Sequence, residues 1–455
     1  MQLHAAAARG DLNGMAFALK HGTDVNARNS HGQTALLYAL ERSRGFSARH
    51  GLAVTPDAVR FLINAGMNLE APDSLGATAI HHAAAIPNPD LLEVMLEHGG
   101  NAKHVTKSGY SVMTYACYQP ASPEKRAIVK RLHEAGVALD TKSDYGEFPL
   151  GVCLHFGDLA TLGLLLDLGA DAGPLNWTSV HRAVALGSET DLVRIATGPA
   201  EINTANQRWQ LSPWLLAFIR GELGMIRWLA DHGADLTQVA RNADTLMHIS
   251  ARFGHETVLR WLHDLGADPK AINDFAASPL HEAAEWNHIE CAFTLMDLGA
   301  GANCEGFGQQ QPIHVAKSLE MIQALVNRGG VNVNAVDGCG EWPLKLAAEA
   351  NDIKRIEWLL KQGADVDRTS TGETALHAAV RDDSREAVHL LLSAGANPNQ
   401  QDVDGWTPLF GALSREVIRL LREAGADPTI TDQGGMGPEK WLKDHILIQA
   451  LTEKL

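Results

Sequence analysis

The sequence has no cysteine arrangement typical of a metal or redox site. Its five cysteines lie far apart and no two have CxxC spacing: Cys117, Cys153, Cys291, Cys304 and Cys339. An odd, dispersed set in a chain of this length suits a reducing compartment and buried or incidental thiols. We therefore expect no metal ion, no cofactor and a cytoplasmic or otherwise intracellular protein.

Targeting signals are absent from the sequence as well. The first residues contain no basic region followed by a long apolar stretch, which predicts no secretory signal. The apolar stretch at residues 159–168 is too short for a membrane span and contains Asp167, so we expect no membrane association. A protein delivered into another cell by a signal-independent route has the same appearance, and this alternative stays open.

Motifs for catalysis are also missing. The chain has no GxxxxGK phosphate loop and no GxSxG nucleophile elbow. The segment from His281 to Glu285 resembles the start of a zinc-protease HExxH helix, but Glu285 stands where the second histidine ligand is required. We predict no catalytic residues. The enzyme alternative requires a site assembled from distant repeats.

The charge balance is acidic. Lys and Arg number 38 against 54 Asp and Glu, a formal charge of −16. This charge disfavours extended contact with nucleic acid phosphates and is compatible with a basic protein partner. The alternative is that the acidity serves solubility alone.

What the sequence does contain is a repeat. One apolar position recurs, most often every 33 residues: Leu3, Leu36, Ile80, Met113, Leu150, Val180, Trp214, Met247, Leu280, Ile313, Leu344, Leu376 and Leu409. In eight repeats a glycine follows it by 19 residues: Gly22, Gly99, Gly169, Gly233, Gly266, Gly299, Gly363 and Gly395. A glycine after a Leu-rich run indicates a helix end, and Ser278-Pro279 before Leu280 indicates a helix start. Each unit is predicted to be a turn, two helices and a loop.

These segments resemble the ankyrin repeat. The likeness is carried by the Thr374-Ala375-Leu376-His377 segment and by residues 390–397, and it extends over nearly the whole chain as about thirteen units and a terminal cap. The resemblance implies an all-α solenoid of stacked helix-turn-helix units with β-hairpin-like loops, whose fingers and first helices form a concave face. Single helix pairs cannot bury their apolar stripes, so the units must stack. The recurring histidine that His281 shares with His377 is predicted to be structural, bonding backbone between repeats.

Departures from the repeat predict the organisation of the single solenoid, residues 1–455. Residues 1–30 are expected to be an N-terminal cap repeat, and residues 433–455 a C-terminal cap. Residues 41–57 stretch repeat two and carry Arg42, Arg44 and Arg49, either as a tolerated loop or as a contact for an acidic partner. Irregular residues 198–210 predict a seam between an N-terminal block at 58–200 and a C-terminal block at 201–432.

Aromatic and charged residues at finger tips and first-helix ends are the candidate binding residues. Such positions need no large apolar side chain for folding, and aromatic anchors carry much of the energy of protein contacts. The predicted set is Tyr110, Tyr118, Tyr145, Phe156, Trp177, Arg208, Trp209, Arg241, Asp244, Arg252, Phe253, Phe275, Glu285 and Trp286. The alternative is that several of them pack against neighbouring fingers as local core.

The function expected from these features is non-enzymatic. We expect a protein-binding scaffold or inhibitor that captures another protein on its concave face and is monomeric on its own. A delivered effector or a toxin-neutralising immunity protein fits the same features. A nucleic-acid-associated protein and an enzyme on a repeat scaffold are the disfavoured alternatives.

Overall fold

The structure is a computed structural model that describes residues 2–29, 31–43, 54–195, 198–206, 210–370 and 372–441. The regular elements of these residues are α-helices and short 3-10 helices, with no β-strand among them. An isolated antiparallel bridge joins Val105 and Ser111. The all-α class predicted from the sequence is confirmed.

Contacts divide the chain into two compact units. Unit 1 comprises residues 1–220 with 231–234, and unit 2 comprises residues 221–230 with 235–455. The expected blocks at 58–200 and 201–432, and the seam between them, stay predictions. The expected insert at 41–57 and the C-terminal cap at 433–455 fall largely outside the described residues, which resume at residue 54 and end at Trp441.

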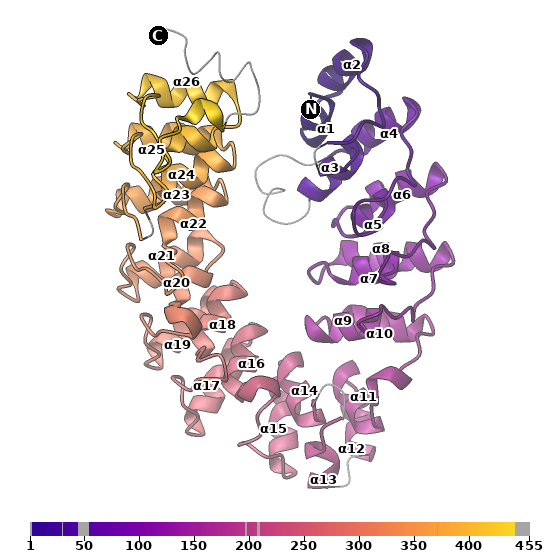
Figure 1. The fold of residues 1–455 in the computed structure, drawn as a ribbon. Helices are drawn as coiled ribbons and strands as arrows, with labels where there is room; N and C mark the ends of the chain where they lie inside the picture. Colours follow the sequence, from indigo (N-terminus) through magenta and orange to yellow (C-terminus); the bar gives the residue numbers. More distant parts are fainter. Residues whose placement is uncertain are drawn as a thin grey trace. The chain divides into compact units, whose positions relative to one another are not determined.

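Unit 1 consists of two rows of helices. The first helices are α1 (Gln2–Ala8), α3 (Ala35–Arg42), α5 (Ala79–Ala84), α7 (Val112–Cys117), α9 (Pro149–His155), α11 (Ser179–Leu186) and α14 (Pro213–Arg220). The second helices are α2 (Leu12–Lys20), α4 (Pro56–Asn64), α6 (Pro89–Glu97), α8 (Pro123–Glu134), α10 (Leu159–Asp167) and α12 (Glu189–Ile195), followed by the short α13 (Pro199–Asn203). Contacts run along each row, from α3 through α5 and α7 to α9 and from α4 through α6 and α8 to α10 (Figure 1).

Unit 2 has the same arrangement. It begins with α15 (Leu223–Asp231). Its first helices are α16 (Leu246–Arg252), α18 (Pro279–Glu285), α20 (Pro312–Val315), α22 (Pro343–Glu349), α24 (Ala375–Arg381) and the 3-10 turn η5 (Pro408–Gly411). Its second helices are α17 (Glu256–Asp264), α19 (Ile289–Asp297), α21 (Leu319–Asn327), α23 (Ile353–Lys361), α25 (Arg385–Ser393) and α26 (Arg415–Glu423). Among the described residues the remaining 3-10 turns are η2 (Gly173–Leu175), η3 (Arg241–Ala243), η4 (Phe307–Gln309) and η6 (Pro438–Lys440).

The recurring apolar position forms the core between the rows. All thirteen anchor residues are buried, from Leu3 at 0% exposure to Val180 at 4%. Facing alanines such as Ala283 and Ala284 are fully buried at 0%. Small side chains there allow neighbouring first helices of one unit to approach closely. The spacing of anchors read from the sequence is therefore the spacing of stacked helix pairs.

The helix ends follow the predicted chemistry. Gly395 has φ +93°, a left-handed conformation that side chains with a Cβ disfavour, and its N–H donates to the carbonyl of Leu392. At the other end, Thr374 is the N-cap of α24, and its hydroxyl accepts from the backbone N–H of His377.

The recurring histidine links one repeat to the next, as predicted. The Nδ1 atom of His377 accepts from the backbone N–H of Thr374 at 3.1 Å, so its proton lies on Nε2. Nε2 then donates to the carbonyl of Trp406 at 3.1 Å. The same Nε2–carbonyl bond to the next finger, at 2.8–3.1 Å, is made by His4, His181, His248, His281 and His314.

The loops are short fingers that hydrogen-bond to each other. In most of them a backbone N–H donates to a carbonyl four residues on, as from Asn273 to Ala277 at 3.0 Å. Adjacent fingers are joined by a further bond, as from the N–H of Phe307 to the carbonyl of Phe275 at 2.9 Å. These bonds fix the backbone of each finger relative to the next, so side chains at the tips of neighbouring fingers lie side by side.

Candidate functional site

Four of the predicted aromatic residues lie at the ends of first helices. Tyr118, Phe156, Phe253 and Trp286 are the C-cap residues of α7, α9, α16 and α18. Tyr118 and Trp286 are each 37% exposed, and the other two are half-buried. All four rings are thus at least partly exposed at the ends of these helices.

Finger tips carry three strongly exposed aromatic side chains. Tyr145 is 77% exposed and Phe275 is 53% exposed. Phe307 is 78% exposed at the next finger along from Phe275, and it was not among the predicted residues. Its signal in the sequence was its place in the turn of the following repeat, where flanking glycines suggested a turn and nothing more.

Two other predicted tip residues lie elsewhere in their fingers. Tyr110 closes its finger, because its carbonyl accepts from the N–H of Thr106 at 3.0 Å. Trp177 is half-buried beside Asn176, which ends η2 in a left-handed conformation with φ 53°. Arg208 and Trp209 lie outside the described residues.

In unit 1 the aromatic residues of two repeats converge on one carboxylate. The hydroxyl of Tyr118 donates to Oε2 of Glu147 at 2.7 Å, and the hydroxyl of Tyr110 donates to the same oxygen. The Tyr110 and Tyr145 rings are 6.5 Å apart, and those of Tyr118 and Phe156 are 6.0 Å apart. We call Tyr110, Tyr118, Tyr145, Glu147 and Phe156 the tyrosine–glutamate cluster.

The environment of the cluster keeps its phenols protonated. Burial, followed by the hydrogen bond to Glu147, raises the pKa of Tyr118 far above its usual range. The same causes raise the pKa of Tyr110. Both hydroxyls are therefore donors at neutral pH, and Glu147 is their shared acceptor.

In unit 2 the predicted charged residues form an internal network. Arg252 donates through Nε to Glu282 at 2.8 Å and through Nη2 to Asp244 at 2.7 Å. Asn273 donates to the other oxygen of Asp244 at 2.7 Å. Asp244 and Glu282 are 3% and 7% exposed, so these groups are satisfied within the chain and hold adjacent first helices together.

The other two predicted charges lie at the surface. Arg241 is exposed in η3. Glu285 is exposed at the end of α18, and its Oε1 lies 3.6 Å from Nζ of Lys317 in an ion pair that solvent screens. Glu285 thus lies one residue before Trp286, on the same surface.

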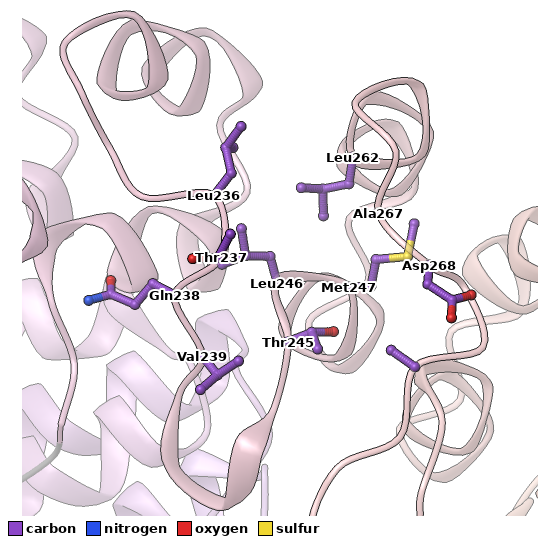
Figure 2. Close-up of a pocket in the computed structure, with 11 residues that line it drawn as sticks. Leu236, Thr237, Gln238, Val239, Thr245, Leu246, Met247, Leu262, Ala267 and Asp268 are labelled. Atoms are coloured by element: carbon purple, nitrogen blue, oxygen red, sulfur yellow. The ribbon is translucent and has the colours of Figure 1, made fainter.

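A small pocket opens between two loops of unit 2 (Figure 2). Its volume is about 260 Å³, and its walls include Leu246, Met247 and Leu262, with Asp268 as the sole acid among the lining residues. The hydroxyl of Thr237 bonds to Asp235 at 2.7 Å. The lining contains no pair of titratable groups suited to acid–base chemistry.

The zinc-protease resemblance at residues 281–285 is explained by the fold. Both ring nitrogens of His281 are engaged, Nδ1 with Ser278 at 3.0 Å and Nε2 with the Gln310 carbonyl at 2.9 Å, and Glu282 is bound by Arg252. Among the described residues no group of three or more His, Cys, Asp or Glu is placed to hold a metal ion. Within the same residues, no helix combines the length and apolar character that crossing a membrane requires.

Comparison with known proteins identifies the repeat. A family model described as ankyrin repeats (3 copies) matches residues 180–273, 214–306, 313–402 and 344–432. A second model, ankyrin repeats (many copies), matches residues 3–48. The two models leave residues 49–179 unmatched.

Individual relatives share parts of the chain. An ankyrin repeat protein of fowlpox virus is 37% identical over 99 residues, which is 21% of this chain and 29% of the relative. The E3 ubiquitin-protein ligase XBAT32 of Arabidopsis thaliana is 30% identical over 173 residues, or 37% of this chain and 29% of the ligase. Ankyrin repeat and SOCS box protein 16 of Mus musculus is 36% identical over 115 residues, or 25% of this chain and 24% of that protein. The matched segments thus span less than a third of each of these relatives.

Similar solved structures include the ankyrin repeat domain of human ASB11, with a TM-score of 0.44 and 27% identity over 48% of this chain and 100% of that one. Another is the ankyrin repeat domain of Bcl-3, with a TM-score of 0.40 and 25% identity over 54% of this chain and 98% of that one. The family models match more than half of the sequence, and the helices, glycine turns and linking histidines agree with them. The chain belongs to the ankyrin repeat family.

Proposed function

We propose that this protein is a non-enzymatic scaffold or inhibitor that captures another protein on the face formed by its fingers and first helices. Ankyrin repeats generally act as scaffolds for protein–protein interaction. To this general role we add the face that binds, the residues that make the contact and a function without catalysis. It places the main contact on the concave side that the ankyrin fold implies.

The observation that carries the proposal is the exposed aromatic surface of unit 2. Phe275 and Phe307 project from adjacent fingers that are joined by a backbone hydrogen bond, and Trp286 ends the first helix that follows Phe275. None of these three is part of the buried anchor row. Exposed aromatic side chains on neighbouring fingers of a folded protein are typical of a binding surface.

The polar groups near this surface support binding over catalysis. Arg252, Asp244 and Glu282 satisfy one another, and His281 has both nitrogens in structural bonds. A catalytic base or nucleophile needs a free, perturbed group beside a substrate cavity. These residues are instead consistent with a rigid frame that presents the aromatic side chains.

Two more specific roles follow from the same surface. A toxin-neutralising immunity protein and an effector delivered into another cell both require one tight protein contact, and the formal charge of −16 favours a basic partner in either case. We further propose an intracellular protein that is monomeric on its own and does not bind nucleic acid. The ligase activity of XBAT32 belongs to a protein of which the matched segment is 29%, and we do not extend it to this chain.

Capture from a native lysate tests the proposal. The wild-type chain and a Phe275→Ser/Phe307→Ser variant would be immobilised side by side and the retained proteins identified by mass spectrometry. A matched control is Leu265→Ser, because Leu265 is 51% exposed at the end of second helix α17. A protein retained by the wild type and the control and lost by the finger variant is the expected result. A protein retained by the finger variant and lost by the Leu265→Ser control would assign binding to the second helices, which contradicts the proposal.

A further inference from the structure

We propose that the tyrosine–glutamate cluster of unit 1 binds a cationic side chain, arginine or lysine, of a protein partner. The inference rests on the proposed function, since it names the chemistry of a second contact on the fingers and first helices. It concerns Tyr110, Tyr118, Tyr145, Glu147 and Phe156, which lie in repeats remote in sequence from Phe275 and Phe307.

The Glu147 carboxylate carries a negative charge without a counter-charge among the described residues. Glu147 is half-buried, and its Oε2 accepts from two neutral phenols. In the described part of the chain, Glu147 forms no ion pair with a Lys, Arg or His. Other half-buried carboxylates have a basic partner. Arg131 donates two hydrogen bonds to Glu93, and His82 bonds to Asp73. A partly desolvated carboxylate held by neutral donors attracts a cation.

Aromatic rings lie beside the Glu147 carboxylate. The ring of Tyr145 is 77% exposed and lies 6.5 Å from the ring of Tyr110 at an interplanar angle of 37°. The edge of Phe156 meets Tyr118 at 6.0 Å. A cation is attracted to a ring face when it lies within about 6 Å of the centroid. Because the Tyr118 hydroxyl is 2.7 Å from Glu147, a cation over that ring is also close to the carboxylate.

A cation fits the cluster better than an apolar or an anionic group does. An apolar side chain over the cluster would remove water from Glu147 without replacing it by a donor, which is unfavourable. An anionic group would be repelled by Glu147 and by the net charge of −16. A guanidinium group both stacks on aromatic rings and donates to a carboxylate, so it fits the two features together.

Selective NMR of the full chain tests this contact. The chain has five tyrosines, so a sample labelled with ring-¹³C tyrosine gives few signals, which single Tyr→Phe variants assign. The probes are N-acetyl-arginine amide and, as a neutral counterpart, N-acetyl-norleucine amide, titrated at constant ionic strength. We expect the arginine probe to shift Tyr110, Tyr118 and Tyr145 saturably, to leave Tyr38 unmoved, and to act far more strongly than norleucine.

Two variants make the result specific. Glu147→Gln should weaken arginine binding by about fivefold, the scale of one exposed charge or cation–π contact. Glu320→Gln removes an exposed carboxylate from α21 and should change nothing. Tyrosine signals that do not move, that move equally with norleucine, or that respond unchanged in Glu147→Gln would overturn the inference. A capture experiment in which Phe275→Ser/Phe307→Ser retains the partner would overturn the proposed function and not this inference, because the NMR titration involves no captured protein.

Discussion

The Nε2 atom of His377 donates to the carbonyl oxygen of Trp406 at 3.1 Å, across 29 residues of sequence. On the other side of the ring, Nδ1 accepts from the backbone N–H of Thr374, and this second bond requires a neutral ring. The same geometry recurs along both units. Stacking of the repeats is thereby coupled to the protonation state of a set of histidines.

Acidification should destabilise the fold well above the range in which carboxylates titrate. Burial lowers the pKa of His377, His281 and His248, and it lowers the pKa of His81 to about 4. The unfolded chain then binds more protons than the folded chain below pH of about 6.5, so the free energy of unfolding falls as pH falls.

Above pH of about 6.5 the neutral histidines make their full contribution to the free energy of unfolding. By pH 5 the protonation of His81, which is buried without the Nε2–carbonyl bond, should alone have lowered the free energy of unfolding by about 2 kcal/mol. Urea unfolding at pH 7.5, 6 and 5 measures the effect. An unfolding midpoint that stays constant from pH 7.5 to 5 contradicts this role of the histidines.

Replacing one linking histidine should destabilise its repeats at neutral pH. His377→Ala removes the bonds to Thr374 and Trp406 and leaves the Trp406 carbonyl with the N–H of Asp402 as its remaining donor, at a cost of roughly 1–3 kcal/mol. His389→Ala is the matched control, because His389 is exposed on the neighbouring α25. Denaturation curves of the two variants should differ clearly, and equal curves would show that the bond contributes little.

A buried lysine should be essential to the stability of unit 1. Lys125 is 0% exposed, and its Nζ donates to the carbonyls of Cys117 and Gln119 at 2.7 and 2.9 Å and pairs with Asp158 at 3.0 Å. Lys125→Met leaves that carboxylate buried without its counter-charge, with the N–H of Thr161 still bonded to Oδ1, which costs about 3–5 kcal/mol.

Adding Asp158→Asn to Lys125→Met should recover part of this loss, because the orphaned charge is removed. Lys130→Met, an exposed lysine of the same helix α8, should unfold like the wild type. A Lys125→Met variant as stable as Lys130→Met would show that the buried pair is dispensable.

The finger aromatics should be dispensable for folding. Phe275→Ser and Phe307→Ser affect side chains that are 53% and 78% exposed, and each should change the free energy of unfolding by no more than about 0.5 kcal/mol. Phe148→Ala, at a residue 1% exposed, should cost roughly 3–5 kcal/mol. Thermal unfolding of the three variants distinguishes binding residues from core, and a large loss at Phe307 would assign it to the core.

The repeat itself was readable from the sequence because it rests on local rules. Buried anchors such as Leu376, left-handed glycines such as Gly395 and the histidine at 377 recur at a set spacing, and each has a local cause. The candidate surface was less readable. Finger register decides whether an aromatic residue projects, as Tyr145 does, or closes the finger, as Tyr110 does.

Other features depend on contacts between repeats. Asp244 was expected at the binding surface and is buried in a network with Arg252, 8 residues away, and with Asn273, 29 residues away in the next finger. Lys125 has the sequence pattern of an ordinary solvated lysine, and its three acceptors come from other segments. Side-chain periodicity alone contains no information about such partners.

The central claim is that the finger aromatics of unit 2 bind a protein. The most direct test is titration calorimetry with the purified captured partner, comparing the wild type with Phe275→Ala/Phe307→Ala and with Leu265→Ala. We expect the finger variant to raise Kd by about 30-fold or more, as for aromatic anchors, and the control to raise it by less than about threefold. Equal Kd values for the wild type and the finger variant would contradict the claim.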